Sequence, residues 1–195
     1  AAVVGAATIT TLTQTAGTAN ANQDANSEFR ANLTTTSITL DESNASGGQA
    51  QMRFNTTVNG TSNVVTGTID GGASNEGALL ITDGQATATN ETVTFSGKIG
   101  ATNKLRAIAV GTGTGALGGG NAIFSDSVNA TAILINATNT NDAGVSTAIF
   151  NGAVTGAVSL IGGDNDAEDA TASFTKDLTG NISIEENNTT TGDVT

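Results

Sequence analysis

The chain of 195 residues contains no cysteine, histidine, proline, tryptophan or tyrosine. Without cysteine it can form no disulfide framework and can perform no thiol chemistry. Without histidine, cysteine and tyrosine, proton transfer near neutral pH falls to carboxylates or to a perturbed lysine. The missing tryptophan and tyrosine also remove the side chains that dominate recognition hot spots. We therefore expect no enzyme, and keep a polysaccharide-active β-helix enzyme only as an alternative.

Positive charge is scarce as well. Six lysines and arginines stand against 18 aspartates and glutamates, which gives a net charge of −12. A polyanion does not hold phosphates, so nucleic acids and anionic lipid surfaces are poor partners, whereas small cations are natural ones. No apolar run approaches the roughly 20 residues of a membrane helix, so we expect no membrane span.

The few phenylalanines follow a pattern. Each of the six is followed, four positions on, by an aliphatic residue: Phe29 and Leu33, Phe54 and Val58, Phe95 and Ile99, Phe124 and Val128, Phe150 and Val154, Phe174 and Leu178. Further on, each unit has a second apolar pair, such as Ile133 and Ile135. The phenylalanines recur at a nearly constant spacing, except for one much longer gap between Phe54 and Phe95. We interpret this as an internal repeat, with a hidden turn or an insertion in the long gap.

The spacing inside each unit predicts strands. Apolar residues recur with a period of two, threonine, valine and isoleucine dominate, and glycine, asparagine and aspartate punctuate. Such short strands cannot bury a face alone, but neighbouring coils stacked about 4.8 Å apart can. We predict an all-β parallel β-helix, or β-solenoid, with coils of roughly 24–29 residues. An antiparallel β-sandwich or jelly roll and a disordered chain are the alternatives, since Leu, Ile, Val and Phe reach only about 21% of the residues.

Two stretches, "AIFNGAVTGAVSLI" (148–161) and "ASFTKDLTGNISI" (172–184), repeat one motif and should occupy the same wall of adjacent coils. Units such as "TVTFSGKIGATNKLRAIAV" (92–110) and "TAIFNGAVTGAVSLI" (147–161) resemble repeats of autotransporter passenger domains and rickettsia-type surface-layer proteins. The resemblance covers about residues 27–195, with 1–26 as an N-terminal strand, cap or linker. It implies an extracellular, fibrous or layer-forming protein of the bacterial cell surface. No catalytic motif is matched, so no catalytic residue carries over.

Polar loops follow the strand blocks: 40–49, 69–77, 136–144, 162–170 and 185–193. We expect them to project from one corner of the solenoid. The most acidic is "GGDNDAEDA" (162–170), whose alternating oxygen ligands suit Ca²⁺. Asp164, Asp166 and Asp169 are the candidate ligands. The alternative is a solvated acidic loop without a metal.

Two functions remain open. The first is a structural subunit or segment of a self-assembling surface layer or filament. The second is an adhesin passenger module that binds a cell-surface or glycan target. The final residues, Gly192 to Thr195, copy the approach to another phenylalanine, so we expect the repeats to continue in a longer chain or to join another subunit through strand edges. Thr87, Thr89, Thr92 and Thr94 also suggest a flat, ice-ordering threonine array, but threonine does not recur from coil to coil in the sequence.

Overall fold

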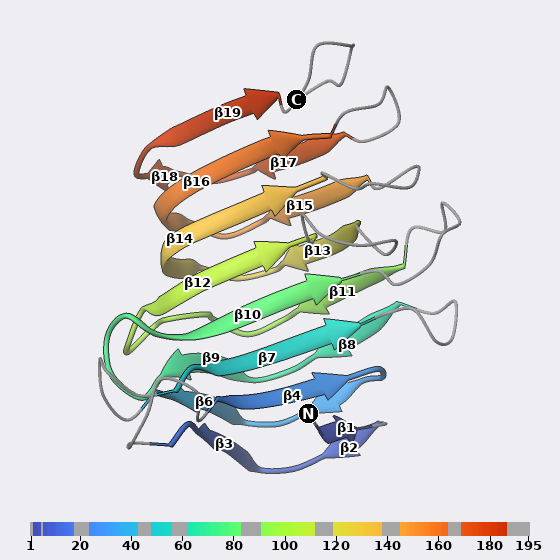
Figure 1. Cartoon of the computed structure of the whole chain (residues 1–195), viewed down its shortest axis with the longest axis vertical. Helices are drawn as coiled ribbons and strands as arrows, with labels where there is room; N and C mark the ends of the chain where they lie inside the picture. The colour runs from blue at the N-terminus through green and yellow to red at the C-terminus, as the bar shows by residue number, and fades with distance from the viewer. Residues whose placement is uncertain are drawn as a thin grey trace.

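The computed structural model is an all-β solenoid whose coils stack along its longest axis (Figure 1). It describes residues 2–4, 6–17, 24–42, 48–55, 62–82, 91–111, 119–137, 145–163 and 169–186, with the backbone alone at 2–4 and 186. Every strand pair within these ranges is parallel. The predicted parallel β-solenoid is therefore confirmed, and the antiparallel sandwich is not what this sequence forms.

The described strands build three sheets, which form the walls of the solenoid. Sheet A contains β1 (Ala2–Val4), β4 (Ala25–Phe29), β7 (Ala50–Asn55), β10 (Glu76–Thr82), β12 (Leu105–Val110), β14 (Val128–Asn136), β16 (Val154–Gly162), β18 (Leu178–Thr179) and β19 (Ile182–Glu186). Sheet B contains β2 (Ala7–Thr8), β5 (Leu33–Thr34), β8 (Asn63–Val65), β11 (Thr92–Phe95), β13 (Gly120–Phe124), β15 (Ser146–Phe150) and β17 (Ala170–Phe174). Sheet C contains β3 (Thr11–Thr15), β6 (Ser37–Asp41) and β9 (Thr68–Gly71).

Sheet C narrows along the molecule. Ile69 of β9 bridges to Ile99, and Ile99 bridges to Val128 at the start of β14. Val128 then pairs with Val154, and Val154 with Leu178. The third wall thus continues as the first residues of β14 and β16 and as β18. Residues 1–26 contribute β1, β2 and β3, which form the first layer of all three sheets.

The core follows from the period of two. In β15 the residues alternate between buried and half-exposed, and the pattern repeats in β7 and β13. Because the strands pair in register, the inward residues of successive coils form columns, for example Leu79, Ile108, Ile133, Val158 and Ile182. Burying each such aliphatic side chain contributes about 1.5–3 kcal/mol. The two repeated stretches lie on the same walls, with Phe150 paired to Phe174 and Val154 to Leu178.

The six phenylalanines form one stack of rings but not one register. Phe29 pairs with Phe54 on sheet A, whereas Phe95, Phe124, Phe150 and Phe174 align on sheet B. The column changes walls where the rings of Phe54 and Phe95 meet edge to face, with centroids 5.2 Å apart. The shared offset in the sequence therefore does not mean a shared wall, because the first two rings lie on sheet A. Of their partners, Leu33 lies on sheet B and Val58 lies outside the described residues.

The long phenylalanine gap has the same cause. Phe54 pairs with Ile81 one coil later on sheet A, and Phe95 pairs with Val65 one coil earlier on sheet B. The gap is therefore one ordinary coil plus the step from sheet A to sheet B. The hidden turn without phenylalanine is thus confirmed, because Ile81 of β10 takes the place of a phenylalanine on sheet A, and these pairings need no insertion. Coils are longest in the N-terminal half, where Leu33 pairs with Val65, and are shorter where Phe150 pairs with Phe174.

The Thr-Gly pair of the repeated motif marks a bend within the coil. Gly156 and Gly180 have φ of 149° and 150°, a conformation that side chains disfavour. A Cβ at Gly156 would lie 2.1 Å from the carbonyl oxygen of Ala130, and one at Gly180 would lie 1.9 Å from that of Gly156. Glycine is therefore required where the chain passes from the third wall to sheet A.

Candidate functional site

The predicted calcium ligands fall in the segment that joins β16 to β17. Asp164 and Asp166 lie outside the described residues. Asp169, directly before β17, is half-buried, and its main-chain oxygen accepts a hydrogen bond from the N–H of Ser146 at 2.9 Å. Within the described ranges no three aspartates or glutamates gather where they could hold a metal ion. The Ca²⁺ site stays a prediction.

The polar loops leave the solenoid at two corners. Segments 40–49 and 69–77 connect sheet C to sheet A, whereas 136–144 and 162–170 connect sheet A to sheet B. The expectation of a single corner is therefore wrong. The acidic segments therefore do not form one column along the solenoid. The repeat in the sequence indicates where each coil begins, but it does not indicate which two walls a loop connects.

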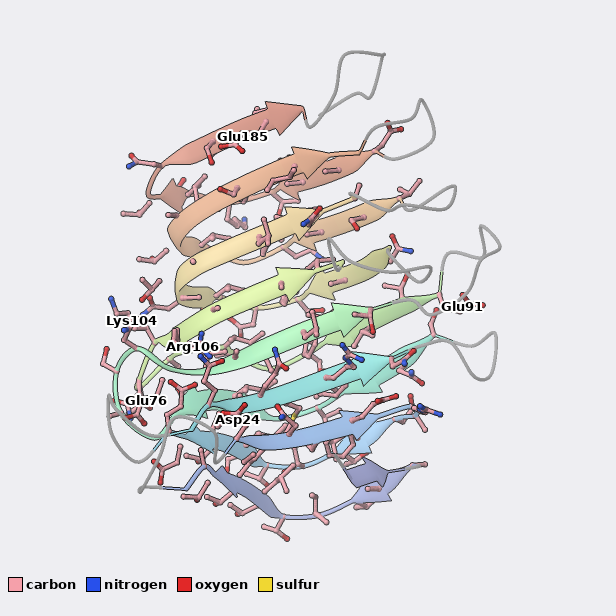
Figure 2. The ribbon with its side chains drawn as sticks, viewed as in Figure 1. Asp24, Glu76, Glu91, Lys104, Arg106 and Glu185 are labelled. Carbon is pink, nitrogen blue, oxygen red and sulfur yellow. The ribbon has the colours of Figure 1, made fainter. Side chains whose placement is uncertain are left out.

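A polar cluster joins three coils at the corner between sheets C and A. Figure 2 draws Glu76, Lys104 and Arg106 on this side of the stack. Arg106 donates from Nε and Nη2 to the carboxylate of Glu42, with an N–O distance of 3.1 Å at Nη2. The Glu42 side chain is 11% exposed and also accepts the N–H of Ala50. Glu76 in turn accepts the N–H of Glu42. Each carboxylate in the cluster has its own donor, so the cluster clamps the corner and does not await a ligand.

Glu91 is buried on the opposite side of the stack (Figure 2). It precedes β11, is 6% exposed, and its Oε2 has no hydrogen-bond partner among the described residues. Because the side chain is buried, it places no carboxylate on the surface beside sheet B. One carboxylate oxygen does not make a metal or catalytic site, since either chemistry needs a second group.

The last described coil leaves its core columns open. Ile182 and Ile184 are 49% and 60% exposed, whereas Val158 and Leu160, one coil earlier, are 1% and 3% exposed. Phe174 and Leu178 are only partly buried. In the described part of the chain β19 pairs with β16 alone. This surface, which we call the open end, combines apolar side chains with a strand edge that offers backbone hydrogen bonds.

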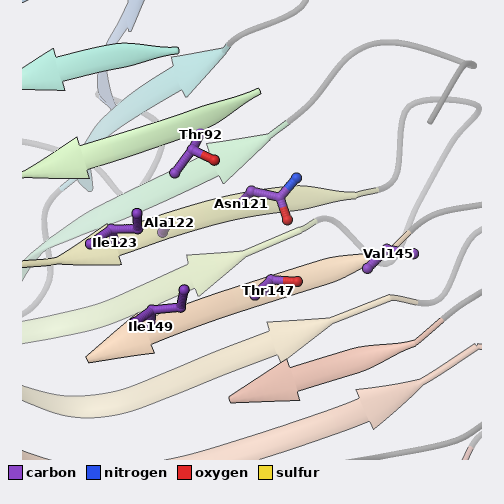
Figure 3. Close-up of a pocket in the computed structure, with 7 residues that line it drawn as sticks. All are labelled: Thr92, Asn121, Ala122, Ile123, Val145, Thr147 and Ile149. Atoms are coloured by element: carbon purple, nitrogen blue, oxygen red, sulfur yellow. The ribbon is translucent and has the colours of Figure 1, made fainter. Parts of the chain in front are cut away.

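The outer face of sheet B is the second distinctive surface. Its seven strands contain no charged residue, whereas charged residues occur in both sheets A and C, for example Arg53 and Asp70. Two outward columns run along it: Thr92, Asn121, Thr147 and Thr171, and Thr94, Ile123, Ile149 and Ser173. A shallow depression of about 260 Å³ lies over these columns (Figure 3).

The threonines of this face repeat in part. Thr92, Thr147 and Thr171 share one column, so the expectation that threonine does not recur from coil to coil is wrong there. In the neighbouring column Thr94 is followed by Ile123 and Ile149. This face could not be recognised from the threonine run of one coil, because its columns combine residues from several coils. The sequence pattern that indicates this face is the alternation in β13 and β15. The residues between the buried positions of these strands, which point outward, are Asn, Ile and Thr.

The fold defines the chain as a parallel β-solenoid protein. Comparisons with protein-family models, with curated proteins and with solved structures found no match to this chain. The described part contains no helix that could span a membrane.

Proposed function

We propose that this chain is a structural protein of the bacterial cell surface, a subunit or segment of a self-assembling layer or filament. One observation carries the proposal: two core columns of sheet A run from Met52 and Phe54 of β7 to β19 and are left exposed there at Ile182 and Ile184. A further β-coil placed on this end would bury these side chains and pair the free edge of β19. Each isoleucine so covered contributes up to about 1.5–3 kcal/mol.

A second copy can join the open end in one orientation only. All described strands pair in parallel, so a copy that continues sheets A and B must add its first layer, the strands β1 and β2. Ala7, Ile9 and Leu12 in or beside that layer are also only partly buried. Joining unlike ends is a heterologous contact, which builds filaments when it does not close into a ring. Strand lengths favour sheet A for this contact, where β19 has five residues and β1 has three, whereas the facing strands have five and two residues on sheet B and two and five on the third wall.

The composition is compatible with a structural role. A cysteine-free chain with a net charge of −12 does not depend on disulfides and stays soluble until its ends meet. The resemblance of its units to surface-layer and passenger repeats points the same way. An adhesin passenger module differs in one respect: it binds its target as a monomer.

The test is concentration-dependent assembly of the full chain, followed by sedimentation velocity and negative-stain microscopy. The wild-type chain should form species that lengthen with concentration. Ile184→Lys, which puts a charge into the open end, should stop the growth. Ile161→Lys is the matched control, because Ile161 lies one coil earlier on the outward side of β16 and is half-buried. A chain that stays monomeric at every concentration, or equal effects of both variants, would overturn the proposal.

A further inference from the structure

The outer face of sheet B is neutral on a strongly acidic molecule. The outward residues of β11, β13, β15 and β17 are threonine, asparagine, isoleucine and serine. Along the chain, charged residues follow these strands in the turns, at Lys98, Asp126, Lys176 and Asp177. Those turns carry both signs, as the polar rim of an interface does. The face is therefore an uncharged patch whose border carries both signs where the strands end and the acidic Asp169 directly before β17.

The face is also regular enough to meet a copy of itself. The strand pairs of β11, β13, β15 and β17 keep register throughout, and the irregularity between Asn129 and Ala132 belongs to sheet A. Ile123 and Ile149 are neighbours in one outward column, and both are half-buried. A two-fold axis between them sets Ile123 of one copy against Ile149 of the other. Such an isologous contact needs only one self-complementary patch.

The distribution of charge decides which faces of two copies can meet. Two copies that each carry −12 repel one another, and the repulsion is weakest where the facing surfaces carry no charge. Sheets A and C present acidic residues such as Glu28, Asp41 and Asp70. We infer that two copies of this chain pair side by side through the outer faces of sheet B. The inference rests on the proposed self-assembly and names its lateral interface.

The size of the face sets the strength of the contact. Seven strands about 4.8 Å apart span roughly 29 Å, and strands of two to five residues are about 7–17 Å long. One copy thus offers on the order of 400 Å², about half of the roughly 800 Å² per partner of a stable interface. A single lateral pair is therefore weak. Copies already joined end to end present several faces at once, and the linked contacts strengthen one another.

The experiment separates the lateral pair from end-to-end growth. All samples carry Ile184→Lys, and sedimentation equilibrium is measured over a range of concentrations at low and high salt. We expect a monomer–dimer equilibrium that stops at the dimer and strengthens with salt, because salt screens the repulsion between the acidic copies. Adding Ile149→Lys should weaken the dimer at least tenfold. Adding Leu134→Lys, on the outward side of sheet A, should leave it unchanged.

Three results would overturn the lateral pair. The first is a monomer at every concentration and salt. The second is an equal loss of dimer with Ile149→Lys and Leu134→Lys, when thermal unfolding shows all variants folded. The third is a monomer whose sheet B face holds another ligand, detected as polysaccharide binding or ice-growth inhibition that Ile149→Lys removes. None of these results depends on whether the wild-type open end grows, so the two proposals fail separately.

Discussion

Phe150 lies inside the aromatic stack, between Phe124 and the last ring, Phe174. It is fully buried, with ring centroids 4.9 Å from Phe124 and 5.0 Å from Phe174. Phe150→Ala removes a core ring that has neighbours on both sides, so the free energy of unfolding should fall by about 3–5 kcal/mol. Urea unfolding followed by circular dichroism measures the loss.

The matched control is Phe174→Ala. Phe174 has a ring neighbour on one side and is only partly buried, so its loss should be clearly smaller. Equal losses at the two positions, or a loss below about 1 kcal/mol at Phe150, would contradict the stacked core.

At the residue scale the sequence predicted the inside of the molecule well. The fixed offset between Phe124 and Val128, or Phe150 and Val154, reflects two inward columns on neighbouring walls. It did not reveal that Phe29 and Phe54 line a different wall. A count of residues between rings cannot separate a longer coil from a change of wall, because both change the spacing alike.

The clamp between Glu42 and Arg106 ties the end of β6 to β12, in strands far apart in the sequence. Arg106→Gln leaves the carboxylate of Glu42 with the N–H of Ala50 as its remaining donor in the described set. Hydrogen bonds to charged groups contribute about 1.5–3 kcal/mol, and the arginine is 32% exposed, so we expect a loss near the lower figure.

Thermal unfolding of Arg106→Gln beside Lys176→Gln, a change at an exposed lysine, checks this prediction. The lysine variant should unfold like the wild type. A loss below about 0.5 kcal/mol for Arg106→Gln would put the clamp among ordinary surface ion pairs.

The Ca²⁺ site expected in the acidic segment 162–170 stays a prediction. Crowded carboxylates repel each other, and a bound cation removes that repulsion. Isothermal titration calorimetry should detect Ca²⁺ binding that Asp166→Asn weakens and that raises the unfolding temperature. Asp177→Asn, in the turn before β18, is the control and should leave binding intact. No heat and an unchanged unfolding temperature at millimolar Ca²⁺ would contradict the prediction.

At the element scale strands were predictable and corners were not. Alternation and β-branched residues identified the strands around Phe95, Phe124 and Phe150. The assignment of loops to one corner failed because 69–77 follows sheet C and 162–170 follows sheet A. Each loop is polar wherever it leaves the solenoid, so composition alone cannot tell which two walls it joins.

At the scale of the whole molecule the two proposed contacts have different chemistry. The open end offers apolar columns and a strand edge at Ile182 and Ile184, whereas the sheet B face offers a neutral, regular surface around Ile149. The sequence predicted a strand edge at Gly192 to Thr195, which lie outside the described residues, whereas the exposed isoleucines lie in β19. The neutral face could not be anticipated from the sequence, because it appears only when the outward positions of strands far apart in sequence are set side by side.

The central claim is that coils continue from one copy to the next along the solenoid axis. Fibre diffraction from aligned assemblies of the full chain tests it most directly. Strands stacked along the axis give a reflection near 4.8 Å, about the spacing between neighbouring strands, on the meridian. We predict this meridional reflection for the wild type and no oriented fibres for Ile184→Lys. Fibres whose reflection at about 4.8 Å lies on the equator would have coils stacked across the axis, and that result would contradict end-to-end stacking.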